Sequence, residues 1–276
     1  MRLAISNIAW DVEEDAAVAD LLGQHQIDAI DIAPGKYFPK PSEATPAEME
    51  RVRTWWAERG IEITGMQALL FGTTGLNVFG DETSRRTLLD HLAGVARIGS
   101  GLGATRIVFG SPKNRDRTGL DDQRTRAMAK DFFGQLGDIA AREGVLFCLE
   151  PNPECYGANF MVDSDETAEI VRFIDHPAIR MQLDTGALTL NGEHADTVLA
   201  RHASLIGHVH ASEPQLVPLG DGDTDHRAAS SALRQYLPEH LITIEMVATR
   251  DEPHLQSIER ALDAASRAYR DGAAHQ

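Results

Sequence analysis

The chain has 276 residues, of which 42% are hydrophobic and 25% are charged, and its formal net charge is −16. This length is sufficient for one large core, and no apolar run approaches the roughly 18 residues that a membrane span needs. The negative charge repels polyanions at long range and so disfavours nucleic-acid binding, because nucleic-acid-binding proteins usually carry basic patches.

The first residues and the cysteines add two expectations. The segment MRLAISNIAW lacks the apolar core of a signal peptide, and its alternating apolar residues predict a first strand. Cys148 and Cys155 do not make a disulfide framework. We therefore expect a cytoplasmic protein with no membrane association. The last six residues, DGAAHQ, are expected to fray.

Short apolar strands alternate with amphipathic helices along the whole chain. In the first half, we predict strands over Arg2–Asn7, Ile27–Ala33, Glu62–Gln67 and Arg106–Phe109. The helices that follow these strands are predicted over Glu13–Gln24, Pro46–Arg59, Thr83–Gly101 and Asp121–Glu143. In the second half, we predict strands over Val145–Glu150, Arg180–Asp184, Leu205–His210 and Leu241–Glu245. Their helices are one capped by Asp165, then Asp196–His202, Arg227–Leu237 and Pro253–Tyr269.

Repeated strand–helix units predict a parallel sheet with right-handed crossovers. Eight units of about 34 residues fit the closure of a barrel. An open, doubly wound sheet is the rival, but it usually has a glycine-rich turn after its first strand, and SNIAWD contains no glycine. No linker or low-complexity segment divides the chain. We therefore predict a single (β/α)8 barrel domain over residues 1–276, in the α/β class.

Each strand of the second half ends in a side chain that can bind a metal: Glu150, Asp184, His210 and Glu245. The carboxyl ends of neighbouring strands in a barrel lie about 5 Å apart, so these side chains can converge on one point. A lone acidic residue at a strand end is more often a helix cap. Four at equivalent positions are hard to explain in that way, and three converging carboxylates repel one another unless a cation lies between them. Three carboxylates and one imidazole suit Mn²⁺ or Mg²⁺, with Co²⁺ or Zn²⁺ as alternatives.

The segments LEPNP, QLDTG, HVH and TIEM carry a resemblance to a known family. The sequence resembles the xylose isomerase-like barrels, the sugar phosphate isomerase/epimerase superfamily that includes ketose 3-epimerases and the endonuclease IV group. The resemblance implies that Glu150, Asp184, His210 and Glu245 bind one divalent metal, with Mn²⁺ favoured. It also implies that Glu150 and Glu245 are the catalytic acid/base pair on opposite faces of a sugar.

This layout has a chemical rationale. A metal that chelates a carbonyl and its neighbouring hydroxyl acidifies the C–H between them and stabilises an enediolate. Return of the proton to the opposite face epimerises the carbon, whereas return to the neighbouring carbon isomerises the sugar. We therefore expect a metal-dependent isomerase or epimerase acting on a sugar or polyol ketone. A dehydratase or lyase that acts on a keto-sugar or inosose through the same enediolate is the alternative.

Two departures from the ketose 3-epimerases concern substrate binding. Ala187 stands where they have a histidine three residues after the aspartate, and Leu216 stands where they have an arginine six residues after the metal histidine. The endonuclease branch fits less well, because its extra zinc-binding histidines are replaced by Gln67, Gly110–Ser111 and Ala187. A non-catalytic sugar-binding barrel is a further alternative, but it has no need for opposed carboxylates. Relatives commonly form dimers or tetramers, which makes a homo-oligomer a candidate, but the sequence does not determine the oligomeric state.

Several loop residues are candidates for substrate binding. Trp10, Tyr37 and Phe38 are candidates for an apolar wall against a sugar ring, and the alternative is that these aromatics pack under their own loops. Lys113 and Arg115 are candidates to bind a phosphate or carboxylate of the substrate, and the alternative is a solvated basic loop.

Three further polar residues lie near the predicted strand ends. Asn152 is a candidate hydrogen-bond donor to substrate hydroxyls. His226 is a candidate to bind substrate or to support the metal ligands, and a solvated turn is its alternative. His208 alternates with His210 along one strand, and we expect it on the opposite face, between the sheet and a helix.

Overall fold

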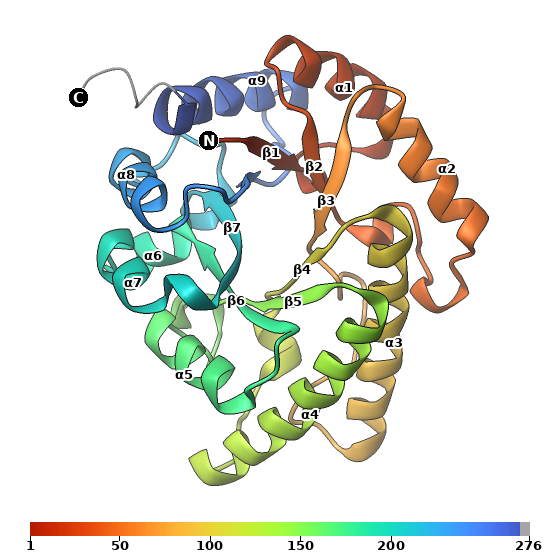
Figure 1. The fold of residues 1–276 in the computed structure, drawn as a ribbon, viewed down its shortest axis with the longest axis vertical. Helices are drawn as coiled ribbons and strands as arrows, with labels where there is room; N and C mark the ends of the chain where they lie inside the picture. Colours follow the sequence, from red (N-terminus) through yellow and green to blue (C-terminus); the bar gives the residue numbers. More distant parts are fainter. Residues whose placement is uncertain (271–276) are drawn as a thin grey trace.

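Eight parallel strands close into a barrel in chain order (Figure 1). The structure, a computed structural model, describes residues 1–270, so the tail predicted to fray lies outside the described residues. The strands are β1 Leu3–Ser6, β2 Ala29–Ile32, β3 Glu62–Met66, β4 Arg106–Phe109, β5 Leu146–Leu149, β6 Ile179–Asp184, β7 Ile206–Ser212 and β8 Ile242–Glu245. β1 pairs with both β2 and β8, which closes the sheet. The predicted (β/α)8 barrel is confirmed.

Helices surround the barrel and cover the outer faces of its strands (Figure 1). They are α1 Asp15–Gln24, α2 Pro46–Ala57, α3 Glu82–Leu102, α4 Asp122–Glu143, α5 Ser164–Ile174, α6 Thr185–Asn191, α7 Ala195–His202, α8 His226–Tyr236 and α9 His254–Ala265. The short helix α6 was not predicted. It follows β6 without a loop, because the side chain of Asp184, the last residue of that strand, caps it by accepting from Ala187 N.

Local capping explains where the long helices begin and end. Asp81 and Asp121 each accept a backbone hydrogen bond at the start of α3 and α4, and Gly103 and Gly144 end these helices in the left-handed conformation. The cap of α5 is Asp163, and the prediction of Asp165 as this cap was wrong. These caps fix the residues at which α3, α4 and α5 begin and at which α3 and α4 end.

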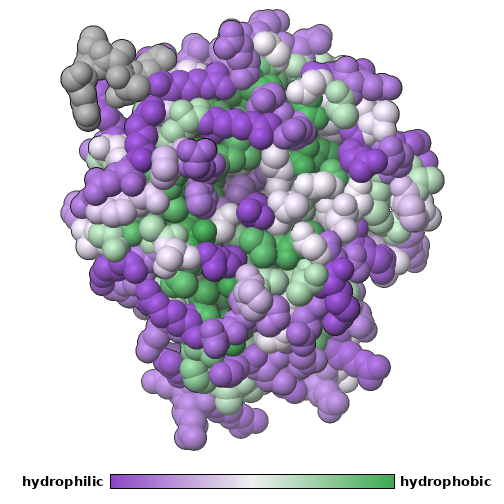
Figure 2. Space-filling view, in the orientation of Figure 1, coloured by the Kyte–Doolittle hydropathy of each residue, from purple (hydrophilic) through white to green (hydrophobic). Residues whose placement is uncertain are grey.

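The apolar core lies mainly between the strands and the surrounding helices. The face drawn in Figure 2 has a mostly hydrophilic periphery, and hydrophobic residues gather nearer its middle. Within residues 1–270, no helix combines the length and the apolar character that crossing a membrane requires.

Candidate metal centre

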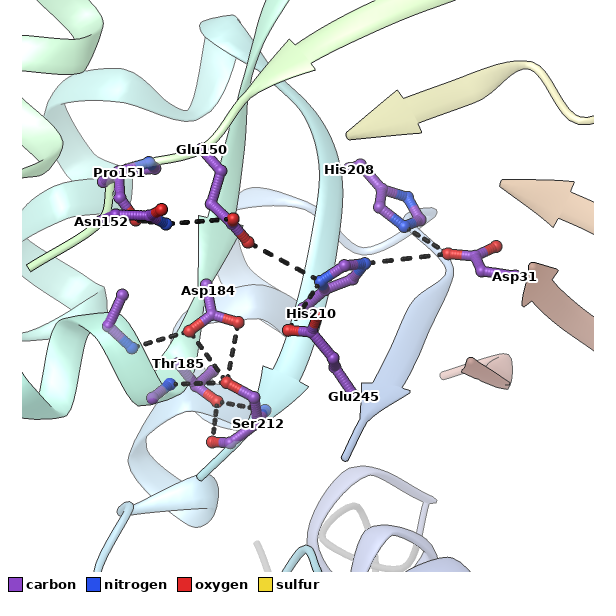
Figure 3. Close-up of polar contacts among 12 residues, drawn as sticks. Asp31, Glu150, Pro151, Asn152, Asp184, Thr185, His208, His210, Ser212 and Glu245 are labelled. Carbon is purple, nitrogen blue, oxygen red and sulfur yellow. Dashed lines mark hydrogen bonds and ion pairs between the residues drawn. The ribbon is translucent and has the colours of Figure 1, made fainter. Parts of the chain in front are cut away.

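The four predicted side chains meet at the carboxyl end of the barrel. Glu150 directly follows β5, while Asp184 and Glu245 are the last residues of β6 and β8. His210 lies two residues before the end of β7, which is longer than predicted and extends to Ser212. One ligand atom from each of the four lies within 4.8 Å of the others, and the side chains point toward one another in Figure 3.

His210 occupies the centre of this group. Its Nδ1 lies 3.2 Å from Glu245 Oε2 and 4.0 Å from Glu150 Oε1, and the ring is fully buried. Among the described residues, neither ring nitrogen has a hydrogen-bond partner. Buried polar atoms are normally paired, so an imidazole nitrogen that faces carboxylates without a hydrogen bond fits a site for a cation. The donor set, three carboxylates and one imidazole, fits a hard or borderline divalent metal.

The charges of the cluster act on one another. Burial raises the pKa of Glu150, and the nearby carboxylates of Glu245 and Asp184 raise it further. Burial and Glu245 likewise raise the pKa of Asp184. Burial alone would lower the pKa of His210, but Glu245 and Asp31 raise it well above its ordinary value. A divalent cation would offset this repulsion, because it favours the ionised form of every carboxylate around it.

Neighbouring groups hold the carboxylates in place. Asp184 accepts hydrogen bonds from Ser212 Oγ, at 2.7 and 2.8 Å, and from the backbone N–H of Ala187, at 2.7 Å. Asn152 Nδ2 donates to Glu150 Oε2 at 3.0 Å. Gly110 leaves room for Glu150, because a Cβ at that position would lie 1.9 Å from Glu150 Oε2. These contacts orient the carboxylates toward one shared point.

A fourth carboxylate, Asp31 of β2, approaches His210 from the other side. Asp31 Oδ2 lies 2.7 Å from His208 Nε2 and 3.8 Å from His210 Nε2 (Figure 3). Thr64 Oγ1 donates to Asp31 Oδ1 at 3.0 Å. A Cβ on Gly65 would lie 2.5 Å from Asp31 Oδ1, so glycine makes room for this carboxylate. Asp31 therefore supports His210 from the side away from Glu150 and Glu245.

The contact of β2 with β7 corrects the position predicted for His208. These two strands are not neighbours in the barrel, so side chains that join them lie inside it. His208 therefore shares the interior face with His210, because residues two apart in a strand point the same way. Asp31 was missed in the sequence. The available signal was an aspartate within the buried strand AIDI, since a buried charge needs a partner.

Residues 19–270 match the model of the family described as xylose isomerase-like TIM barrel. The chain belongs to this family. A comparison with curated protein sequences finds no match.

Three solved structures of similar fold are distant from this chain in sequence. D-psicose 3-epimerase from Clostridium cellulolyticum H10, solved with D-tagatose, is 18% identical, with a TM-score of 0.80 over 98% of this chain and 99% of that chain. A 3-keto-D-glucoside 4-epimerase from E. coli is 18% identical, with a TM-score of 0.77 over 95% and 98%. The IOLI protein, solved with a bound zinc atom, is 18% identical, with a TM-score of 0.74 over 98% and 100%. At these identities the likeness shows the fold.

Two cavities open beside the candidate metal centre of this xylose isomerase-like barrel. The first, here called the β3–β4 cavity, has a volume of about 280 Å³ and lies by the ends of β3 and β4. The second, the β5–β6 cavity, has a volume of about 360 Å³ and lies by the ends of β5 and β6. The residues that line both are Gly110, Glu150, Leu216 and Glu245. The two cavities thus adjoin at the two glutamates.

The predicted aromatic wall does not lie in either cavity. Trp10 is fully buried, and its Nε1 donates to Asp15 at 2.7 Å. Tyr37 donates to the same carboxylate at 2.8 Å, and Phe38 is buried in the core. None of these three aromatics is among the described residues that line the cavities. These aromatics pack under their own loops. Their burial is favourable because the rings leave water while the polar N–H of Trp10 and O–H of Tyr37 keep a hydrogen-bond acceptor in Asp15.

The other predicted substrate residues divide between the cavities and the interior. Lys113 lines the β3–β4 cavity, and Asn152 lines the β5–β6 cavity while donating to Glu150. Arg115 is buried instead of facing substrate, and its Nη1 donates to the backbone carbonyl of Glu150 at 2.7 Å. His226 is also buried, with its ring nitrogens 3.0 Å from Glu213 Oε1 and 2.8 Å from Tyr269 Oη. Arg115 and His226 therefore support the loops of the site.

Proposed function

We propose that this protein is a divalent-metal-dependent isomerase or epimerase that acts on a sugar or polyol ketone. The observation that carries the proposal is the convergence of Glu150, Asp184, His210 and Glu245 at the carboxyl end of the barrel, where barrel enzymes have their active sites. Structures of the same fold that are named as sugar epimerases support it.

The four converging side chains are assigned as ligands of one divalent metal. Their oxygen-rich set suits Mn²⁺ or Mg²⁺, with Co²⁺ or Zn²⁺ as alternatives, and a zinc atom is bound in the IOLI protein. When bound, such a metal polarises a carbonyl and its neighbouring hydroxyl and so acidifies the C–H between them. Lys113 and Asn152, which line the two cavities, are assigned to substrate binding.

Glu150 and Glu245 are assigned as the acid/base pair. They approach His210 from different strands, and both line the two cavities, so a substrate bound there lies within reach of both carboxylates. One of them removes the proton beside the carbonyl, and the other returns it.

A dehydratase or lyase on a keto-sugar or inosose is a second candidate. It needs the same proton abstraction, followed by loss of a neighbouring hydroxyl or alkoxyl group. The feature that favours it is the replacement of two substrate-binding residues of the ketose 3-epimerases by Ala187 and Leu216, both of which line the β5–β6 cavity. Product analysis separates the two reactions, because only elimination forms an unsaturated or dehydrated product.

The first test combines metal content with proton exchange. The protein is reconstituted with Mn²⁺, its metal content is measured, and solvent deuterium incorporation into a panel of ketoses is followed by NMR. About one metal per chain and deuterium beside a carbonyl are expected. Glu150→Gln and Glu245→Gln should each lower the exchange rate by about 10²–10⁴-fold, because each removes a proton-transfer group.

The matched control is Glu154→Gln, which makes the same change at an exposed residue near the site and should keep full exchange. Absence of metal after reconstitution would contradict the assignment of the four ligands. Full exchange in both the Glu150 and Glu245 variants would contradict the assignment of the acid/base pair.

A further inference from the structure

The β3–β4 cavity differs from a pocket built for a free sugar. Its walls beside Glu150 and Glu245 are largely aliphatic and aromatic, from Ile8, Leu69, Leu70, Val108 and Phe109. A sugar has a hydroxyl on nearly every carbon, and each hydroxyl that is buried without a hydrogen bond costs free energy. An aliphatic and aromatic wall therefore favours a ligand group without hydroxyls.

The mouth of the cavity exposes a further apolar side chain. Phe71 lines the cavity and is 89% exposed, the most exposed of the large hydrophobic residues in the described chain. Leu216 lies where both cavities adjoin, at the position where the ketose 3-epimerases have an arginine. Apolar surface thus extends from the two glutamates to the solvent edge of the cavity. A bound apolar group would cover this surface and gain from its removal from water.

One buried amide in the cavity lacks a partner. Gln67, directly after β3, is 3% exposed and lines the β3–β4 cavity. Neither its side-chain nitrogen nor its side-chain oxygen has a hydrogen-bond partner among the described residues. Native proteins rarely leave both ends of a buried amide unpaired. Ligand pockets often combine apolar walls with a few polar groups that orient the ligand, and Gln67 is such a group here.

The size of the cavity also fits a ring. An apolar cavity of roughly 150 Å³ binds benzene, and the β3–β4 cavity has a volume of about 280 Å³. A phenyl group and a short link to the metal centre therefore fit inside it.

We propose that the β3–β4 cavity binds an apolar substituent, aryl or bulky alkyl, of the sugar or polyol ketone whose oxygens lie at the metal centre. The inference rests on the proposed function and narrows its substrate class. Instead of a free ketose, the substrate is amphipathic, for example a keto-glycoside with an apolar aglycone. The hydroxylated part lies at Glu150 and Glu245, and the apolar part lies against Phe71 and Phe109.

The test uses two hydroxamates as probes. A hydroxamate presents two adjacent oxygens to a divalent metal, as a carbonyl and its neighbouring hydroxyl would. Acetohydroxamate carries a methyl group, and 3-phenylpropanohydroxamate carries a phenyl ring on a short link. Their Kd values for the Mn²⁺-loaded full chain are measured by calorimetry. The phenyl compound is expected to bind at least tenfold more tightly, because its ring is removed from water.

A variant at the mouth of the cavity locates the ring. Phe71→Ser should lower the ratio of the acetohydroxamate Kd to the 3-phenylpropanohydroxamate Kd at least threefold. Because Phe71 is exposed, a folding defect is not expected in this variant. The matched control is Val247→Ser, because Val247 is 44% exposed but is not among the described residues that line either cavity. Val247→Ser should leave the ratio unchanged.

The outcomes separate this inference from the proposed function. Equal Kd values for the two hydroxamates would overturn the apolar subsite and leave the metal centre intact. Tighter binding of the phenyl compound with an unchanged ratio in Phe71→Ser would place the ring elsewhere and also overturn it. If neither hydroxamate binds the Mn²⁺-treated protein and no metal is retained, the proposed function fails, and this inference fails with it.

Discussion

At the scale of single residues, Asp31 contacts the candidate metal centre although it lies far in sequence from the four proposed ligands. It faces His210 Nε2, and His210 Nδ1 faces Glu150 and Glu245. A carboxylate behind a metal-binding histidine orients the ring and raises its basicity. We therefore expect Asp31→Asn, which keeps the shape but removes the charge, to weaken Mn²⁺ binding about 10–100-fold in equilibrium dialysis.

Asp165→Asn is the matched control for Asp31→Asn. Asp165 Oδ1 lies 2.6 Å from Nε2 of the buried His202, so the same change removes the charge beside a histidine that joins α5 to α7 on the outside of the barrel. It should leave Mn²⁺ affinity unchanged. Equal affinities in wild-type protein and Asp31→Asn would show that the carboxylate does not support His210.

At the scale of elements, Glu213 organises the loop between β7 and α8. Its carboxylate accepts hydrogen bonds from the backbone N–H groups of Gly220, at 2.9 Å, and Thr224, at 3.0 Å, and it contacts His226. Burial would raise the pKa of Glu213, but hydrogen bonds from His226, Gly220 and Thr224 lower it to about 2. A lowered pKa stabilises the fold above the ordinary value of 4.5, and this contribution is lost as the pH falls toward 2.

Glu213→Gln should therefore lose on the order of 3 kcal/mol of unfolding free energy at pH 7, since the pKa falls from 4.5 to about 2 and one pKa unit corresponds to about 1.4 kcal/mol. Urea unfolding at a series of pH values measures this loss, and the gap to wild-type protein should narrow below pH 4.5. Glu239→Gln, at an exposed glutamate, is the control and should show no gap. A gap that stays constant or widens in acid would contradict the role given to the ionised carboxylate.

At the scale of the whole molecule, closure of the barrel pairs its first strand with its last. Leu3 of β1 pairs with Ile242 of β8 and is 0% exposed. Removal of a buried leucine side chain costs about 2–5 kcal/mol, so Leu3→Ala should lower the Tm by roughly 5–15 °C. Circular dichroism measures this shift. Leu190→Ala, at a side chain that is 39% exposed, should change the Tm by less than about 2 °C. Equal shifts would contradict a closing role for β1.

The sequence alone was enough to predict the barrel and the convergence of four candidate metal ligands. Alternating strands and helices are encoded in local hydrophobic patterns, and parallel strands of one barrel end at the same edge. Residues at strand ends, such as Asp184 and Glu245, are therefore placed by topology, and the structure brings them together with Glu150 and His210. Local patterns sufficed for these residues because their neighbours follow from strand order.

Contacts across the barrel and the burial of loops were decided only by the tertiary structure. Asp31 and His208 come from strands that are not neighbours, so no local pattern shows their contact. Trp10 and Arg115 look like exposed loop residues in the sequence, but the chain covers both. The β3–β4 cavity likewise combines residues that follow several strands. The physical reason is that burial depends on which distant segments pack together, whereas hydrophobic periodicity records only which face of an element turns inward.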